Sequence, residues 1–342
     1  MLLVKEREWR TDNEGVQYRE DATGSFIVPR ALEARENRVF ARKTKPLGIE
    51  TLVPTKVDLP KGATDIVFEY SEEFGEAKIS TGSTQDPPFA ENNVEEEKEK
   101  IITIWNGYRY TKKEWKALEF AARTQAYGRN ANIGTLRQSS CLKGLNTLEH
   151  KIGMFGSPSH GVYGFYNNPE VPPSTASGGF NPLAAATTAQ QLLDFYIEEL
   201  IGNIEDSTEL TEIPNTIVQP RELTRKLIRT KTQQGSGDIT AFQLIMDNLR
   251  EMGTPVTIIS RNESRAADLA AGGVVTHSGS PNQHRIVVYC RDPEALDRQT
   301  SGLEVDEWEK SKGVYSRIMD KDIRGVRWHY PLSAQYVDIP VA

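Results

Sequence analysis

The chain has 342 residues, of which 37% are hydrophobic and 26% are charged, and its formal net charge is −7. A chain of this length can bury a sizeable core and is expected to form about two domains. The negative net charge argues against a general nucleic-acid-binding protein, because such proteins usually carry a clear basic excess.

The cysteines and the N-terminus indicate a protein that is made and used in a cytoplasm. Cys141 and Cys290 lie far apart and lack CxxC spacing, so we interpret both as reduced core residues. The N-terminal sequence turns charged at Lys5, without the apolar core of a signal peptide. No apolar stretch reaches the length of a membrane span, so we expect no membrane partner.

Residues 1–48 are predicted to form an N-terminal arm, because hydrophobic residues are too sparse there for the segment to fold alone. The stretch from residue 30 to residue 45 is basic. It is either a solvated helix face or an arm that lies along a neighbouring subunit. The candidate contact residues in this stretch are Arg30, Arg35, Arg38 and Arg42.

Residues 49–110 are predicted to form strands, including a long hairpin. Residues 49–57 are rich in strand formers, and residues 65–70 alternate between apolar and polar side chains. Residues 76–80 continue the extended pattern. Glycine and proline then interrupt it over residues 81–93, where we expect the tip of the hairpin.

An acidic run follows the interrupted segment at residues 81–93. The run from Glu95 to Glu99 is predicted to belong to the tip, and charge runs of this kind are usually solvated faces. Residues 101–105 then predict an apolar strand, followed by a tight turn at Asn106 and Gly107.

A long exposed hairpin needs protection, because it is marginal in isolation and invites edge-to-edge pairing. Either its acidic residues act as gatekeepers, or a partner covers the whole hairpin, and we favour the second interpretation. The candidate contact residues on the hairpin are Phe74, Glu76, Lys78, Glu95, Glu96 and Glu97.

Residues 111–186 are predicted to contain two helices and a long loop. Thr111 and Glu114 form the capping box of the first helix. After a break near Gly128, the second helix is expected over about residues 134–153, striped by leucines that we interpret as core. Residues 156–186 are rich in Gly, Pro, Ser and Asn and predict an irregular boundary segment.

Residues 187–312 are predicted to form an α/β domain, and residues 313–342 to return to strands. The helices are expected over residues 188–201, 221–230 and 241–252. The strands of this domain are expected over residues 215–219, 256–260, 285–290 and 301–307, with a final strand near residues 334–341.

Motifs for catalysis or for cofactor binding are absent from the sequence. It has no phosphate-binding loop, no dinucleotide fingerprint and no GxSxG elbow. The segment Gly235-Ser236-Gly237 follows a basic helix rather than a strand, so we interpret it as a flexible loop. We predict no catalytic, cofactor-binding or metal-binding residue, since metal-ligand spacing is lacking around His150, His160, His277, His284 and His329.

A family resemblance rests on three elements that occur in order. The first is Leu52-Val53-Pro54-Thr55, with Glu69-Tyr70 and Phe74-Gly75-Glu76-Ala77-Lys78-Ile79 after it. The second, and the most specific, is Gly161-Val162-Tyr163-Gly164-Phe165-Tyr166-Asn167-Asn168-Pro169-Glu170-Val171-Pro172, directly after Lys151-Ile152-Gly153-Met154-Phe155-Gly156. The third is Asn215-Thr216-Ile217-Val218-Gln219-Pro220. Together they resemble the major capsid proteins of tailed phages, a family with the Hong Kong 97-type capsid fold that also resembles encapsulins.

This resemblance covers roughly residues 30–342 and implies an α+β fold of named parts. These are an N-terminal arm (1–48), strands with an extended hairpin called the E-loop (49–110), a peripheral domain with a long spine helix (111–186), an axial α/β domain (187–312), and C-terminal strands that return to the peripheral domain (313–342). The polar break at residues 128–134 predicts a spine helix shorter than usual for the family.

The resemblance implies a major capsid protein that self-assembles into the icosahedral head shell around a phage genome, and no enzyme. Its expected partners are copies of itself in hexamers and pentamers, portal, scaffolding and decoration proteins, and packaged DNA through non-specific contact. It is expected in the virion after assembly in the host bacterial cytoplasm. The alternatives are an encapsulin-type compartment, or an α/β enzyme or ligand-binding protein with a pocket near residues 235–238 or 277–284.

Overall fold

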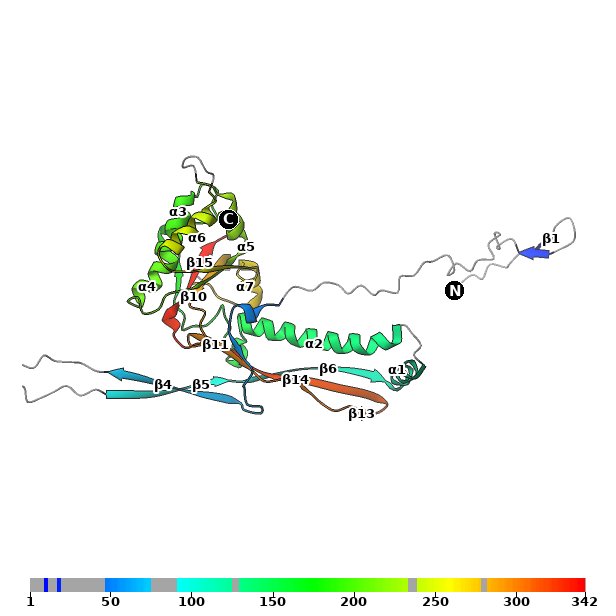
Figure 1. The fold of residues 1–342 in the computed structure, drawn as a ribbon. Coiled ribbons are helices and arrows are strands. Elements are labelled where there is room, and N and C mark those ends of the chain that lie inside the picture. Colours follow the sequence, from blue (N-terminus) through cyan, green and yellow to red (C-terminus); the bar gives the residue numbers. More distant parts are fainter. Residues whose placement is uncertain are drawn as a thin grey trace, which may run out of the picture. The chain divides into compact units, whose positions relative to one another are not determined.

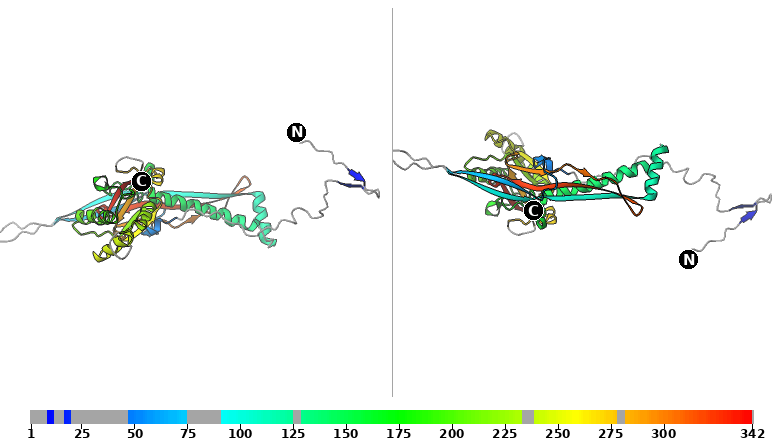
Figure 2. Two further views of the ribbon diagram at one scale, coloured as in Figure 1. Left: turned by 90° about the horizontal axis from the view of Figure 1, so that it is seen from above. Right: turned by 90° about the horizontal axis from the view of Figure 1, so that it is seen from below.

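The structure is a computed structural model that describes residues 9–11, 17–19, 47–74, 91–124, 129–232, 239–277 and 282–341. The chain divides into two compact units, residues 1–45 and 46–342. In the first unit, β1 (Trp9–Thr11) pairs antiparallel with β2 (Gln17–Arg19). The elements named below belong to the second unit, which is drawn in Figures 1 and 2.

One sheet of the second unit is buried on both faces. Its five described strands lie in the order β7 (Pro173–Thr175), β15 (Ala334–Pro340), β10 (Gln283–Tyr289), β8 (Thr216–Pro220) and β9 (Thr257–Arg261). Successive side chains of a strand point to opposite faces. Ile286 and Val288 therefore join one hydrophobic core, and Val287 and Tyr289 join another.

Helices cover the first of these two cores (Figure 1). They are α3 (Ala189–Asp194), which continues through the π-helical η5 (Phe195–Gly202) into α4 (Asn203–Ser207), then α5 (Arg221–Arg229) and α6 (Ala241–Glu251). Thr188 and Thr240 each cap a helix through a complete capping box, which satisfies backbone N–H groups at its start. These helices confirm the prediction from apolar periodicity, whereas the short α7 (Ala266–Gly272) was not predicted.

The second sheet is organised around one long strand, β14 (Val314–Trp328). Its ten-residue antiparallel pairing with β6 (Ile102–Thr111) runs from Val314 opposite Thr111 to Ile323 opposite Ile102. The other described strands are β3 (Thr55–Lys56), β11 (Leu296–Thr300), β12 (Glu304–Val305) and β13 (Glu309–Ser311). The C-terminal residues thus divide between the sheets, because β14 joins this one and β15 joins the other.

The helix α2 (Arg129–Phe155) packs along β6 and β14 (Figure 1). Its core side chains include Cys141, Leu145 and Ile152, which are buried against the sheet, while Leu148 is exposed. The prediction of a helix shortened to begin near residue 134 was wrong, since the helix begins at Arg129 and has 27 residues. Among the described helices, none is long and apolar enough to cross a membrane.

The expected tight turn at Asn106 and Gly107 was also wrong, because both residues lie inside β6. The Asn106 side chain donates to the carbonyl oxygen of Cys141 at 3.1 Å and so ties the strand to α2. The helix α1 (Lys112–Thr124) then begins as predicted. Its capping box is formed by the Thr111 hydroxyl, which accepts from the Glu114 N–H at 3.3 Å, and by the Glu114 carboxylate, which accepts from the Thr111 N–H at 2.9 Å.

The segment after α2, residues 156–172, joins the two sheets through its backbone. Phe165 and Tyr166 are fully buried between them, and the Tyr166 hydroxyl contacts that of Ser264 at 2.8 Å. Asn167 accepts from the Gly164 N–H at 2.6 Å, which fixes the turn. A side chain at Gly164 would place its Cβ 2.3 Å from the Gly156 nitrogen, so only glycine fits there. The most specific sequence element is therefore a structural junction.

The hairpin consists of β4 (Asp65–Phe74) and β5 (Glu91–Lys100), which pair antiparallel with each other and with no other described strand. It projects from one end of the second sheet (Figures 1 and 2). The acidic run was expected beside the tip, but it lies within β5 and pairs with β4. Two further expectations were wrong in detail. Residues 49–57 form the 3-10 helix η2 (Ile49–Thr51) and the short β3, and the strand expected over 301–307 is reduced to β12.

Short 3-10 turns complete the described fold. They are η3 (Pro158–His160) and η4 (Ser177–Gly179) in the predicted irregular segment, and η6 (Pro331–Ser333) between β14 and β15. The long irregular stretch over residues 156–186 is thus confirmed, with β7 as its single described strand.

Candidate subunit-contact site at the base of the hairpin

The hairpin has two chemically different faces, as its register shows. On one face Ile66, Phe68 and Tyr70 of β4 lie opposite Glu99, Glu97 and Glu95 of β5. We call these six residues the aromatic–acidic face. The other face carries exposed side chains, among them Val67, Glu69, Glu96 and Lys98. Glu69 and Glu96 are directly opposite each other there, a like-charge pair that weakens the hairpin.

Two buried arginines of β14 hold the base of the aromatic–acidic face. The guanidinium carbon of Arg327 lies 4.1 Å from the centre of the Phe68 ring and 5.1 Å from that of Tyr70. Its Nη2 is 2.6 Å from Glu97 Oε2, and its Nη1 is 3.0 Å from Glu99 Oε1. Arg324 lies 4.8 Å from the Phe68 ring and 3.4 Å from Glu99. Each arginine thus combines ring stacking with carboxylate pairing.

A β-bulge lets both arginines reach the same face. Arg324 and Arg327 are three positions apart, which in a regular strand would point them to opposite sides. Between the pairs Arg298–Val326 and Thr300–Ile323, however, β14 contains one residue more than β11. This extra residue shifts the alternation of side chains along β14, so that Arg324 and Arg327 both face Phe68.

Further charged groups behind the arginines, some buried and some exposed, extend this pairing. Arg324 pairs with Asp297 of β11, and Asp297 also contacts Lys56 at 3.2 Å and His329 at 3.3 Å. Burial acts to raise the pKa of Asp297, but His329, Arg324 and Lys56 outweigh it, so the pKa lies below its ordinary value. The base of the hairpin is therefore joined to β3 and β11 by charge.

A separate cluster of charges reaches the helix α2 through Glu149. This carboxylate pairs with the fully buried Arg298 at 2.6 Å and with Lys321 at 2.9 Å. Burial alone would raise the pKa of Glu149, but Arg298 and Lys321 lower it overall, so it stays charged. Removing one member of such a buried group leaves its partner uncompensated, which is strongly destabilising.

Glu99 differs from the carboxylates of Asp297 and Glu149. Burial raises its pKa from 4.5 to about 7, although Arg324 acts in the opposite direction, and the neighbouring Glu97 adds to the increase. Its neighbour Glu170 also has a raised pKa, first through burial and then through Glu97. The base of the hairpin therefore contains a carboxyl group that changes its charge near neutral pH.

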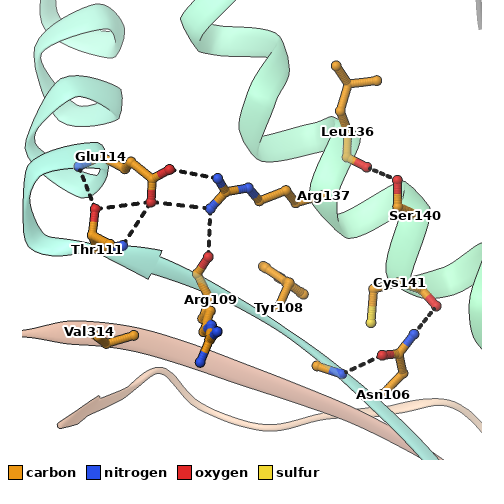
Figure 3. Close-up of a pocket in the computed structure, with 11 residues that line it drawn as sticks. Asn106, Tyr108, Arg109, Thr111, Glu114, Leu136, Arg137, Ser140, Cys141 and Val314 are labelled. Carbon is orange, nitrogen blue, oxygen red and sulfur yellow. Dashed lines mark hydrogen bonds and ion pairs between the residues drawn. The ribbon is translucent and has the colours of Figure 1, made fainter.

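A separate groove of about 720 Å³ lies between β6, α1 and α2 (Figure 3). Within it Arg137 points from α2 toward Glu114, at 2.7 Å, and toward the carbonyl oxygen of Arg109, at 2.6 Å. The hydrogen bond from Arg137 and those from Thr111 lower the pKa of Glu114 to about 2. These groups hold α1 against α2, and none of them forms a nucleophile–base pair.

An enzyme or ligand-binding protein was expected to have a pocket near residues 235–238, which lie outside the described residues, or near residues 277–284, where the described side chains are already engaged. A cavity of about 380 Å³ includes His277 and Arg285. Arg285 is fully engaged there, since it pairs with Asp338 at 2.8 Å and donates to the carbonyl oxygen of Tyr166 at 2.6 Å. His284 accepts from the Ala266 N–H at 3.1 Å, and burial lowers its pKa. Over the described ranges, no group of His, Cys, Asp and Glu could hold a metal ion.

The structure describes some of the predicted contact residues. Glu97 lies in the arginine-bound part of the aromatic–acidic face, Glu95 is exposed farther out on it, and Glu96 is exposed on the opposite face. Phe74 ends β4, opposite Glu91 in the register. Outside the described residues lie Glu76, Lys78, Arg30, Arg35, Arg38 and Arg42.

Sequence reasoning missed the arginines and the role of Glu99. The acidic run was interpreted as a solvated face, which holds for Glu95 and Glu96 but not for Glu97 and Glu99. The alternation of Ile66, Phe68 and Tyr70 was a usable signal for one organised face. Nothing local pointed to Arg324 and Arg327, because they lie more than two hundred residues away in the chain.

Comparison with known proteins identifies the family. The model of the major capsid protein family matches residues 75–339, which is most of the chain. No match was found among curated proteins.

Solved capsid structures share the fold. The chain is similar to the capsid of Myoviridae phage XM1, with a TM-score of 0.67 and 15% identity over 92% of this chain and 99% of that one. It is also similar to the capsid of an empty GTA particle, with a TM-score of 0.58 and 8% identity over 94% and 100% of the two chains. For the mature capsid of bacteriophage PhiM1, the TM-score is 0.55 at 13% identity, over 90% and 91%. The chain therefore belongs to the major capsid protein family, and it is a capsid shell protein with an α+β fold of the Hong Kong 97 type.

Proposed function

We propose that this chain assembles through hexamers and pentamers into the icosahedral head shell that encloses a phage genome. The observation that carries the proposal is the hairpin of β4 and β5, which pairs with no other described strand while its base is held by buried arginines. Subunits that close into rings need heterologous contacts, in which one surface of a copy meets a different surface of the next. A hairpin that projects from the subunit and is held in place at its base provides such a contact.

In this proposal the arginines of β14 set the direction in which the hairpin leaves the subunit. A two-stranded hairpin is marginal in water, and this one has a like-charge pair on its exposed face. Stacking of Phe68 against Arg324 and Arg327 fixes its base to the second sheet. The outer part of the hairpin then lies on a neighbouring copy, which protects its edges.

The parts of the subunit take the places that the family resemblance implies. We propose that residues 111–186, with α2 as the spine helix, form the peripheral domain, and that residues 187–312 form the axial domain at the five-fold and six-fold positions. Residues 49–110 carry the E-loop, and residues 1–48 are the N-terminal arm. The proposed parts exchange strands. β7 and β15 join the sheet of β10, β8 and β9, whereas β11, β12 and β13 pair with β14.

Assembly takes place in the host bacterial cytoplasm and the product is the virion, in this proposal. Portal, scaffolding and decoration proteins are the expected partners, and packaged DNA makes non-specific contacts with the inner surface. The chain needs no cofactor for this role and carries out no catalysis.

The arm provides the first test of the proposal. Residues 1–48 are poor in hydrophobic residues, so we expect them to find their packing contacts only on a neighbouring subunit. Deletion of residues 1–29 is therefore expected to leave a soluble subunit that no longer forms closed shells. Electron microscopy and sedimentation of the truncated chain check this, with the full-length chain as control. Normal closed particles from the truncated chain would contradict the role of the arm.

A further inference from the structure

The charge of the chain is concentrated in the hairpin. Strands β4 and β5 together contain nine acidic residues and two lysines, which gives a formal charge of −7. This equals the formal net charge of the whole chain, so all the other residues together are neutral. A surface of this kind attracts a cationic partner and is repelled by the phosphates of DNA.

The aromatic–acidic face shows which cation it binds, because part of it is already occupied. At its base, Phe68 stacks on Arg327 at 4.1 Å and Glu97 accepts from the same guanidinium at 2.6 Å. A planar, forked guanidinium satisfies a ring and a carboxylate at once, which the compact ammonium of lysine does less well. The base of this face thus already binds one arginine side chain, that of Arg327.

The same arrangement, an aromatic ring on β4 opposite a carboxylate on β5, continues outward along the hairpin. One step beyond Phe68 and Glu97, the register places Tyr70 opposite Glu95, again a ring opposite a carboxylate. Glu95 is exposed and Tyr70 is partly exposed. The cation that the described structure places nearest Tyr70 is Arg327, at 5.1 Å, and its Nη2 already pairs with Glu97. Glu95 accepts only a long hydrogen bond, 3.5 Å, from the exposed Asn93 side chain, and among the described residues no arginine pairs with it.

We propose that the outer part of the aromatic–acidic face, at Tyr70 and Glu95, binds arginines from residues 30–45 of a second copy of this chain. The inference rests on the proposed shell function and names the surface that receives the arm. That segment contains six basic and two acidic residues, and it has four arginines. It also belongs to the N-terminal unit, residues 1–45, whereas the aromatic–acidic face belongs to the second unit. Its Val39 and Phe40 supply apolar cover for the stacked rings.

A charge-reversal experiment with a matched control tests the surface. Glu95→Arg changes the proposed site, whereas Glu96→Arg makes the same change one residue away on the opposite face. The measured quantity is the fraction of full-length chain that sediments as closed shells. In this proposal Glu96 makes no subunit contact, contrary to the expectation from sequence, because it lies on the opposite face. We therefore expect Glu95→Arg to reduce that fraction at least tenfold and Glu96→Arg to stay within about twofold of the unchanged chain. Equal effects of the two variants would overturn the proposal.

A compensating change on the other side identifies the partner segment. A chain with Arg35→Glu, Arg38→Glu and Arg42→Glu is expected to lose assembly, and to regain a substantial part of it when Glu95→Arg is added. Addition of Glu96→Arg is not expected to restore it. Failure of Glu95→Arg to restore assembly would overturn the assignment to residues 30–45.

Cross-linking shows whether the contact joins two copies. Glu95→Cys is combined in turn with Arg35→Cys, Arg38→Cys and Arg42→Cys, and assembled shells are oxidised and run on a non-reducing gel. At least one pair is expected to give a ladder of linked chains, and the matching pairs with Glu96→Cys are not. Products linked only within one chain, or no product, would overturn the proposal. If the unchanged chain forms no shells at all, the proposed function fails instead.

Discussion

Arg324 and Arg327 show how one residue type can order a surface that would otherwise be only a solvated hairpin. Both side chains are buried, and such burial is costly unless the charge is paired and its N–H groups are directed at acceptors. Here the paired carboxylates come from the hairpin and from β11, and Phe68 stacks on both guanidinium groups. Nε and Nη1 of each arginine have no hydrogen-bond partner among the described residues, so the ion pairs and the stacking carry the stabilisation. The energetic consequence is a hairpin base that depends on these two residues.

Replacement of Arg327 by alanine is expected to release the hairpin. The change leaves Glu97 and Glu99 without their closest cation and removes the stacking on Phe68, so the free energy of unfolding should fall by about 3 kcal/mol. Urea unfolding measures this loss, and limited proteolysis should show earlier cleavage within residues 65–100. Arg109→Ala, at an exposed position of β6, is the control and should change stability by less than about 0.5 kcal/mol. Equal losses in the two variants would contradict the role of Arg327.

Glu99 makes the stability of the subunit depend on pH near neutrality. Its pKa is about 7 in the fold and near 4.5 in the unfolded chain, so between these values the folded state binds the proton more tightly. Its contribution to stability is therefore present at low pH and is lost as pH rises from 4.5 through 7, by about 3 kcal/mol at most. Unfolding of the unassembled subunit should show this decline, and Glu99→Gln should remove it. Glu96→Gln serves as the control, and an unchanged pH profile in Glu99→Gln would contradict the assignment.

At the scale of elements, local patterns predicted the helices well and the strand pairings poorly. The capping box at Thr111 and Glu114 marked the start of α1 correctly, because capping depends on residues three positions apart. By contrast, Asn106-Gly107 is a strong turn signal that tertiary structure overrides, since β6 pairs with β14 through both positions. The start of α2 was placed too late because the polar stretch at residues 128–134 was interpreted as a break, whereas the helix begins at Arg129.

The partner surfaces of the hairpin could not be predicted at all from local sequence. The alternation of Ile66, Phe68 and Tyr70 gave one face of a strand. The acidic half of that face depends on the register with β5. The arginines that bind it depend on a bulge in β14, a strand far along the chain. A bulge of one residue changes which side chains share a face, and no short pattern reports it.

The junction after α2 offers a test at the element scale. A methyl group at residue 164 would lie 2.3 Å from the Gly156 nitrogen and 2.7 Å from the Met154 carbonyl, so the backbone itself must move. Gly164→Ala is expected to reduce the free energy of unfolding by about 2–3 kcal/mol. Gly302→Ala has nothing within 4 Å of the added group and is the control. Thermal unfolding of both variants checks the contrast, and similar melting temperatures would contradict the close-packed junction.

For the whole molecule, the separation of charge connects structure with assembly. The projecting hairpin strands have a formal charge of −7, the rest of the chain taken together is neutral, and within that rest residues 30–45 carry a basic excess. Oppositely charged extensions of one chain favour contacts between copies in a fixed order, because like extensions repel. The whole chain therefore has the charge pattern of a subunit that assembles with itself.

Electron microscopy of the expressed full-length chain tests the central claim most directly. A shell protein whose hairpin and arm find their packing contacts only on neighbouring subunits should sediment as megadalton particles. Images of these particles should show closed icosahedral shells in which each hairpin lies on an adjacent copy. A chain that remains a monomer or a small oligomer at every protein concentration examined would contradict the account.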